Sequence, residues 1–128
     1  MIGAAIYSIL VNTTAITDIV GQAIYPEIAP QGKEMPFVIY QIDEVIPETT
    51  KDGPSCLDTY SINLIVFGKE YDELSLLSQE IRTALDRYRG IVEGVDIDQG
   101  NFKGFESGYD TKANVFVQES EYDMRINI

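Results

Sequence analysis

The stretch LDTYSINLIVFGKEYDELSLLSQEIRTALDRYRG, residues 57–90, contains a clear strand followed directly by a clear helix. Apolar and polar side chains first alternate with the two-residue period of a half-buried strand. The apolar positions of that strand are Tyr60, Ile62, Leu64 and Val66. From residue 71 the apolar side chains recur every three or four positions, which predicts a helix with one buried face. That face holds Leu74, Leu77, Ile81, Leu85 and Tyr88, and Gly90 is expected to end the helix.

A second strand is predicted just upstream, in FVIYQIDEVI, residues 37–46. Val38, Tyr40, Ile42 and Ile46 are expected to share its buried face, and the opposite face is expected to turn polar at Gln41 and Asp43. The polar segment PETTKDGPSC, residues 47–56, is expected to form a loop with a turn at 52–54. A connection this short cannot contain a crossover helix, so the two strands are predicted to pair as an antiparallel hairpin.

Two short helices are expected before these strands, and further strands after the long helix. Apolar spacing predicts the helices at 2–11 and 15–20, with Gly21 as a stop signal. Beyond Gly90, Val95 and Ile97 alternate with acids, residues 107–114 read as a turn, and the chain closes on a strand. The predicted class is α+β, an antiparallel sheet of about four strands with the long helix packed on one face, in the order α-α-β-β-α-β-β. We expect a single domain over residues 1–128.

The composition argues against most catalytic chemistry. The net charge is −12, from 9 basic and 21 acidic residues, and such a surface opposes binding to phosphate backbones. The chain has no histidine, the commonest member of catalytic triads and zinc sites, and its one cysteine, Cys56, reads as a structural thiol. The segment DIDQGN, residues 96–101, begins like a calcium loop but has Asn101 where that loop needs glycine. We therefore predict no enzyme activity, no catalytic residue, no metal site and no cofactor. No run reaches the roughly 18 apolar residues of a membrane span, so no membrane contact is expected.

The carboxylates near the C-terminus follow the period of a strand. Asp96 and Asp98 would share one face of their strand, and Glu119, Glu121 and Asp123 would share one face of the last strand. Two interpretations stay open at this point, a solvated acidic sheet face and an acidic surface with a function.

Several short motifs in a fixed order resemble one known family. They are Ile24–Tyr25–Pro26, then "APQG" at 29–32, then "PFV" at 36–38 followed by Tyr40, and finally "YDE" at 71–73, which opens the long helix. In this order the chain resembles, over most of its length, the tail-completion proteins of tailed bacteriophages, also called tail terminators or head–tail joining proteins. Each motif is short, and their order and spacing carry the resemblance.

The resemblance implies a structural virion protein without a cofactor. Members of the family form rings, typically hexameric, that cap the head-proximal end of the tail tube, end its polymerisation and join the tail to the head. The implied partners are other copies of the chain, the tail tube protein and a neck or head-completion protein, while DNA passes through without specific binding. The implied location is the tail–neck junction of the virion, after assembly in the host cytoplasm, from a phage or a prophage.

Two sets of site residues follow from this resemblance. The proline-rich loop is expected to contact a partner, because a pre-set loop loses little entropy on binding. The residues of that loop are Tyr25, Pro26, Pro30, Gln31, Gly32 and Pro36. The acids Asp96, Asp98, Glu119, Glu121 and Asp123 are expected to line or border the ring lumen. A head-side neck adaptor, and an acidic protein-binding or DNA-mimic module, remain as alternatives. Ring size, host, and the face that meets the tube stay open.

Overall fold

The computed structural model describes residues 2–32, 34–50 and 53–128, with side chains at all of these positions except 49–50 and 53–56. The predicted α+β class is confirmed, but the sheet has six strands rather than about four. The elements are α1 (Ile2–Val11), α2 (Thr14–Val20), β1 (Ile24–Pro26), β2 (Phe37–Thr50), β3 (Gly53–Gly68), α3 (Tyr71–Leu85), β4 (Gly90–Val92), β5 (Val95–Asp110) and β6 (Val115–Asn127).

The two additional strands are short and lie at the sheet edges. The strand order is β1-β2-β3-β6-β5-β4. The four long strands pair antiparallel, whereas β1 runs parallel to β2 and pairs only with residues 38–40. At the other edge β4 pairs only with residues 95–97 of β5. Strands of three residues are too short to show an alternating pattern, so the sequence gives no periodic signal for them.

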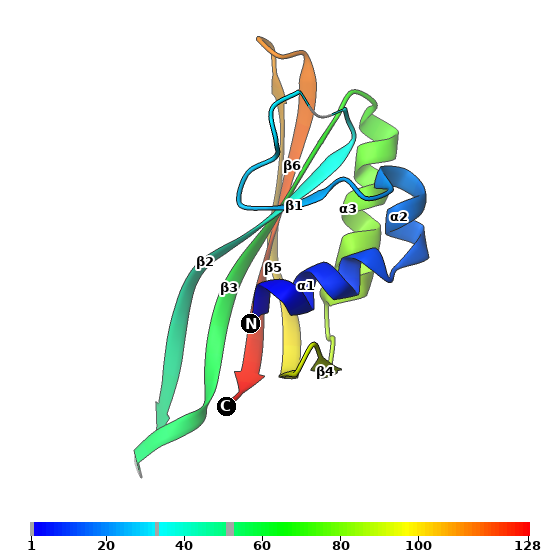
Figure 1. The fold of residues 1–128 in the computed structure, drawn as a ribbon. Coiled ribbons are helices and arrows are strands. Elements are labelled where there is room, and N and C mark those ends of the chain that lie inside the picture. Colours follow the sequence, from blue (N-terminus) through cyan, green and yellow to red (C-terminus); the bar gives the residue numbers. More distant parts are fainter. Residues whose placement is uncertain (1, 33, 51–52) are drawn as a thin grey trace.

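All three helices lie on one side of the sheet (Figure 1). The core therefore forms between α3 and the facing sides of the long strands. The predicted helix face is confirmed, because Leu74, Leu77, Ile81 and Leu85 are completely buried. The predicted faces of α1 and α2 also lie in this core, through side chains such as Ile6. The even-numbered residues 62–66 of β3 and 118–126 of β6 face the helices, so the odd-numbered ones point to the opposite side, called here the open face.

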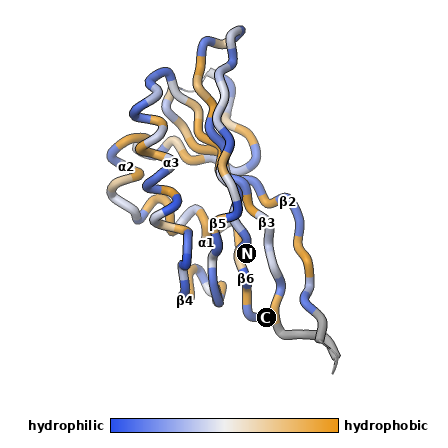
Figure 2. The backbone as a smooth tube through the Cα atoms, turned by 180° about the vertical axis from the view of Figure 1, so that it is seen from behind, coloured by the Kyte–Doolittle hydropathy of each residue, from blue (hydrophilic) through white to orange (hydrophobic). Residues whose placement is uncertain are grey.

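The hairpin of β2 and β3 is longer than predicted and extends past the helices at one end of the molecule (Figures 1 and 2). The antiparallel pairing is confirmed, but the loop predicted at 47–56 is wrong at both of its ends. Residues 47–50 and 53–56 belong to β2 and β3, and pairing continues to Thr50↔Gly53. Polar strands of this kind are stabilised by the hydrogen bonds between the paired strands and not by burial of side chains. Their composition is therefore the same as that of a loop, and it does not indicate a strand. Residues 51–52 and the side chain of Cys56 lie outside the described parts.

β-Bulges shift the faces of two strands. One lies between Ile42 and Glu44 of β2, so Val45 takes the helix side and Ile46 faces away. The prediction that Ile46 shares the buried face is therefore wrong, and its side chain is 50% exposed. In β5, bulges lie between Ile97 and Gln99 and between Phe102 and Gly104.

The long helix ends at Leu85, five residues before the predicted stop at Gly90. The chain turns instead at Arg87, whose φ is 63°, and runs beside β5. There the Arg87 N–H donates to the Gly100 carbonyl at 2.6 Å, and the Gly100 N–H donates to the Tyr88 carbonyl at 2.9 Å. A Cβ on Gly100 would lie 2.3 Å from the Leu85 carbonyl oxygen, so this close approach requires glycine.

The C-terminal hairpin also differs from its predicted bounds. β5 continues to Asp110, so the turn covers 111–114 and not 107–114. The Asp110 carboxylate accepts from the backbone N–H groups of Lys112 and Ala113 and holds this turn in place.

No single helix among the described residues is long and apolar enough to cross a membrane; α1 and α2 pass that test only together, and they are bent by 83° at their junction.

Candidate functional site

The open face of the sheet is strongly acidic. Asp96 pairs with Asn127, and Glu106 pairs with Glu119 directly across the β5–β6 ladder. Glu121 and Asp123 follow at alternate positions of β6 and therefore point the same way. The prediction that Glu119, Glu121 and Asp123 point to the same side of their strand is therefore confirmed.

Glu119 lies at the centre of this acidic surface. Burial raises the pKa of its carboxyl group, and Glu106, Asp43 and Glu121 raise it further through their negative charges. A hollow of about 390 Å³ lies here, lined by Asn63, Gly104, Phe105, Glu106, Glu119 and Glu121. Like charges placed opposite each other in a ladder destabilise the sheet, so this arrangement is not explained by stability.

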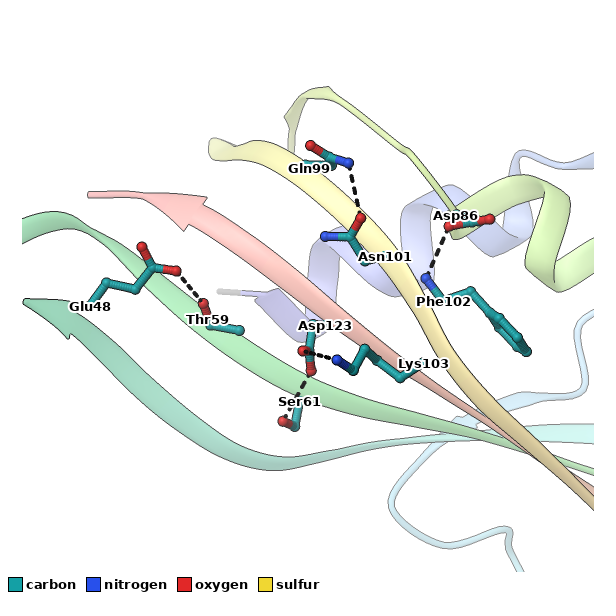
Figure 3. A network of polar contacts seen from close by, with 9 residues as sticks. All are labelled: Glu48, Thr59, Ser61, Asp86, Gln99, Asn101, Phe102, Lys103 and Asp123. Carbon is teal, nitrogen blue, oxygen red and sulfur yellow. Dashed lines mark hydrogen bonds and ion pairs between the residues drawn. The ribbon is translucent and has the colours of Figure 1, made fainter.

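Two cations partly balance the acids nearer the hairpin end of the face. Lys103 lies 3.6 Å from the Asp123 carboxylate, which also accepts from the Ser61 hydroxyl (Figure 3). Arg125 lies 3.3 Å from Glu48 and 3.9 Å from Asp98. Asp98 therefore points to the open face although it occupies a bulge.

The five predicted acids thus lie on one face but differ in their partners. Asp98 and Asp123 are paired with cations, whereas no ion pair within the described residues involves Asp96, Glu119 or Glu121. The acids Asp43 and Glu44 also lie on this face, beside Asn63 and Ser61, although the sequence analysis did not include them among the candidate acids. Two-residue alternation from Gln41 places Asp43 on this face. No periodic signal could have placed Glu44, because it reaches this face only through the bulge.

The proline-rich loop has fixed ends and an exposed centre. Tyr25 pairs with Ile39 in the β1–β2 ladder, and its ring meets Phe37 edge-on at 6.2 Å. Phe37 in turn stacks on Phe67 at 4.9 Å on the open side of the sheet. Pro36 is half-buried at the entry to β2. Of the predicted contact residues, Tyr25 and Pro36 therefore anchor the loop.

The exposed part of this loop is available to a partner. Pro26, Pro30, Gln31 and Gly32 are exposed, and the neighbouring Ile28 is 78% exposed. The loop leaves β1 on the side away from the helices (Figure 1). The prediction that this loop contacts a partner remains a prediction.

A groove runs between α3 and β5 on the helix side. It has a volume of about 500 Å³, and its lining includes Ser78, Arg82, Phe102, Phe105 and Ser120. The Arg82 guanidinium lies 3.9 Å from the centre of the Phe102 ring, a cation–π contact. The groove is more apolar than the open face and offers a packing surface rather than a reactive centre.

Nearby, a buried hydrogen-bond chain joins α3 to β6. The Ser78 hydroxyl donates to Gln118 Oε1 at 2.7 Å, and Gln118 Nε2 donates to the Ser75 hydroxyl at 3.0 Å. Gln118 is almost completely buried, so these bonds satisfy its amide and fix the helix against the strand.

No group of three His, Cys, Asp or Glu side chains in the described part of the chain is placed to hold a metal ion. The features present are an acidic face, an exposed loop, a groove and free strand edges, all of which suit contacts between macromolecules.

The comparisons with known proteins agree with this description. The chain has the fold of a protein chain in a structure described as the virion of a native gene transfer agent particle, with a TM-score of 0.83. The two are 16% identical, and the match covers 98% of this chain and 93% of the other. No curated protein sequence gave a significant match. Residues 4–127 match the family described as tail completion protein gp17. Because this match spans nearly the whole chain, the protein belongs to the family of tail completion protein gp17.

Proposed function

We propose that this chain is a structural protein of the virion tail, which forms a hexameric ring at the head-proximal end of the tail tube. The ring ends polymerisation of the tube and joins the tail to a neck or head-completion protein. Membership in the tail completion family supports this proposal, and so does the occurrence of the same fold in a gene transfer agent virion. The protein would be made in the host cytoplasm, from a phage or a prophage, and would end at the tail–neck junction.

The asymmetry of the sheet is the observation that carries the proposal. One face is buried under the helices, and the other carries Glu106, Glu119 and Glu121 without an ion-pair partner in the described residues. Facing a channel, these acids would repel DNA phosphates and keep the wall from holding what slides past it. A protein that grips DNA needs the opposite charge.

The exposed centre of the proline-rich loop fits a contact with a neighbouring protein. The prolines of this loop, Pro26, Pro30 and Pro36, restrict its backbone before binding, so less entropy would be lost on contact. We assign these residues to contacts within the ring or with the tube.

Deletion of the gene tests the function. We expect heads without tails and tails of irregular length in electron micrographs, both corrected when the gene is supplied on a plasmid. Tails of normal, uniform length in the deletion strain would contradict a terminator. If those uniform tails also stayed separate from heads, the head-side adaptor would be the better assignment.

The acidic-module alternative has less support. A DNA mimic presents carboxylates in place of phosphates, but here Lys103 and Arg125 interrupt the acids of the open face.

A further inference from the structure

Within residues 2–32, 34–50 and 53–128, the sheet has two strand segments with no strand beside their outer edge. β1 covers β2 only at residues 38–40, and the Glu27 side chain accepts from the Ile42 N–H, so no other described segment pairs with the outer edge of β2 over residues 43–50. β5 is covered by β4 at 95–97 and by the segment after α3 at Gly100 and Phe102. In the described residues no strand lies beside β5 over 103–110. Free edges of this length are rarely left exposed in a stable assembly.

We propose that the β2 edge of one copy adds to the β5 edge of the next copy, so that the sheet continues from subunit to subunit. This inference rests on the proposed ring. Strand direction supports it, because β2, β3, β6 and β5 alternate in direction. With four alternating strands, copies in the same orientation place β5 antiparallel to the β2 of the neighbour. The contact is head-to-tail and closes as a ring.

The positions of the free edges set the stagger between copies. Within one copy, Glu106 pairs with Glu119, Glu119 pairs with Ile65, and Ile65 pairs with Ile39. Glu106 and Ile39 therefore lie at the same height along the strands of the sheet. Bringing 103–110 beside 43–50 of a neighbour therefore displaces that neighbour by roughly seven residues, or about 23 Å at ~3.3 Å per residue. Four strands are about 19 Å wide at ~4.8 Å per strand. The resulting tilt is about 50°, near the roughly 35–45° of closed barrels.

The same stagger keeps the short edge strands clear of the contact. β1 lies beside residues 38–40, and β4 lies beside residues 95–97, so each would sit beyond the end of the new strand pair. The short strands thus limit which parts of the two edges can meet.

The side chains on the two edges are complementary. On the helix side, Val45 of β2 is 44% exposed, and Phe105 and Tyr109 of β5 are each 49% exposed. Joining the edges would place these apolar side chains on one face and cover them. Among the described charged residues, segment 43–50 of β2 carries only acids, whereas segment 103–110 of β5 carries Lys103 together with Glu106 and Asp110. Arg82 of α3 lies over Phe102 next to this segment, and its side chain is more than half exposed, as is that of Lys103. The complementarity of the two edges therefore rests on the apolar side chains, and Lys103 and Arg82 are the cations available to the acids of β2.

Disulfide cross-linking tests the contact. In a Cys56→Ser background, Val45→Cys is combined in turn with Phe105→Cys, Ser107→Cys or Tyr109→Cys. These three positions lie on the helix side of β5, as Val45 does on β2. We expect one of the pairs to give, on mild oxidation of the assembled ring or tails, a ladder of covalent oligomers that a reductant removes.

Control pairs use the other side of the same strand. Val45→Cys with Glu106→Cys or Gly108→Cys places the two thiols on opposite faces, so no ladder is expected. Rings that form without a ladder from any same-side pair would overturn the inference and leave the proposed ring intact. Ladders of equal yield from opposite-side pairs would overturn it as well. Failure to form any ring, both in solution and on tails, would instead overturn the proposed function together with this contact.

Discussion

Glu119 of β6 and Glu106 of β5 lie directly opposite each other across an antiparallel ladder, on the exposed side of the sheet. Two like charges in this position repel, and the pKa of Glu119 is raised by burial and then by Glu106, Asp43 and Glu121. A fold selected only for stability would not keep such a pair. The proposed channel wall gives a reason for the Glu106–Glu119 pair, because acids on the open face would repel the DNA that passes.

The first prediction concerns the charge on Glu119. Because the folded protein holds the Glu119 proton more tightly than the unfolded chain, ionisation at neutral pH lowers stability. Glu119→Gln should raise the melting temperature at pH 7, and the gain should shrink as the pH falls through the folded pKa toward the unfolded value of 4.5. Thermal unfolding across this pH range measures it. The control is Asp18→Asn, which removes one negative charge from an exposed position of α2, away from the acidic face. An equal rise in melting temperature for this control would mean that the gain comes only from the lower net charge.

The second prediction concerns the buried face of α3. Ile81 is completely buried, so Ile81→Ala should lower the free energy of unfolding by about 2–5 kcal/mol. Leu76, on the same helix, is 49% exposed, so Leu76→Ala serves as a matched control with a much smaller loss. Denaturant unfolding of the two variants gives the comparison. Equal losses would mean that the two helix faces contribute alike.

The third prediction concerns Tyr122 at alkaline pH. Burial raises the pKa of Tyr122 to about 12; the Ser120 hydroxyl and the Arg82 charge oppose this shift, and the Asp86 charge adds to it. The unfolded chain ionises this tyrosine near pH 10, before the folded protein does, so its contribution to stability is complete below pH 10 and is lost as the pH rises toward 12. Tyr122→Phe removes this loss. The melting temperature should therefore fall less steeply between pH 10 and 12 in the variant, and parallel curves would contradict the assignment.

The regular parts of the fold could be read from the sequence because each follows one period. The helix face of Ile81 and the strand face of Ile62 repeat without interruption and are buried as predicted. A bulge has no such signature, because it arises where two strands adjust their register. Phe102 shows the consequence. Two-residue alternation from Asp96 would place Phe102 on the open face, but the bulge at Asp98 turns its ring to the helix side. There it packs edge-on against Tyr122 at 5.6 Å.

The other errors have the same cause, which is contact between distant segments. The outer part of the β2–β3 hairpin is polar and gains its order from pairing, so its composition resembles that of a loop. The early end of α3 goes with the hydrogen bonds that Gly100 makes to Arg87 and Tyr88, which no local sequence pattern shows. The acidic face was predicted correctly for the last strand, because Glu119, Glu121 and Asp123 alternate without a bulge.

The central claim, that the open face borders a channel for DNA, is tested most directly by the rate of DNA ejection. Glu119→Lys with Glu121→Lys reverses two acids on that face, and Asp18→Lys with Glu73→Lys makes the same charge change on the exposed helix side. In particles that assemble normally, we predict slow ejection from the first variant, relieved by added salt because phosphate contacts weaken with ionic strength. The second variant should eject at the normal rate. Normal ejection from correctly assembled particles of the first variant would contradict the claim and leave the acidic face as solvated surface.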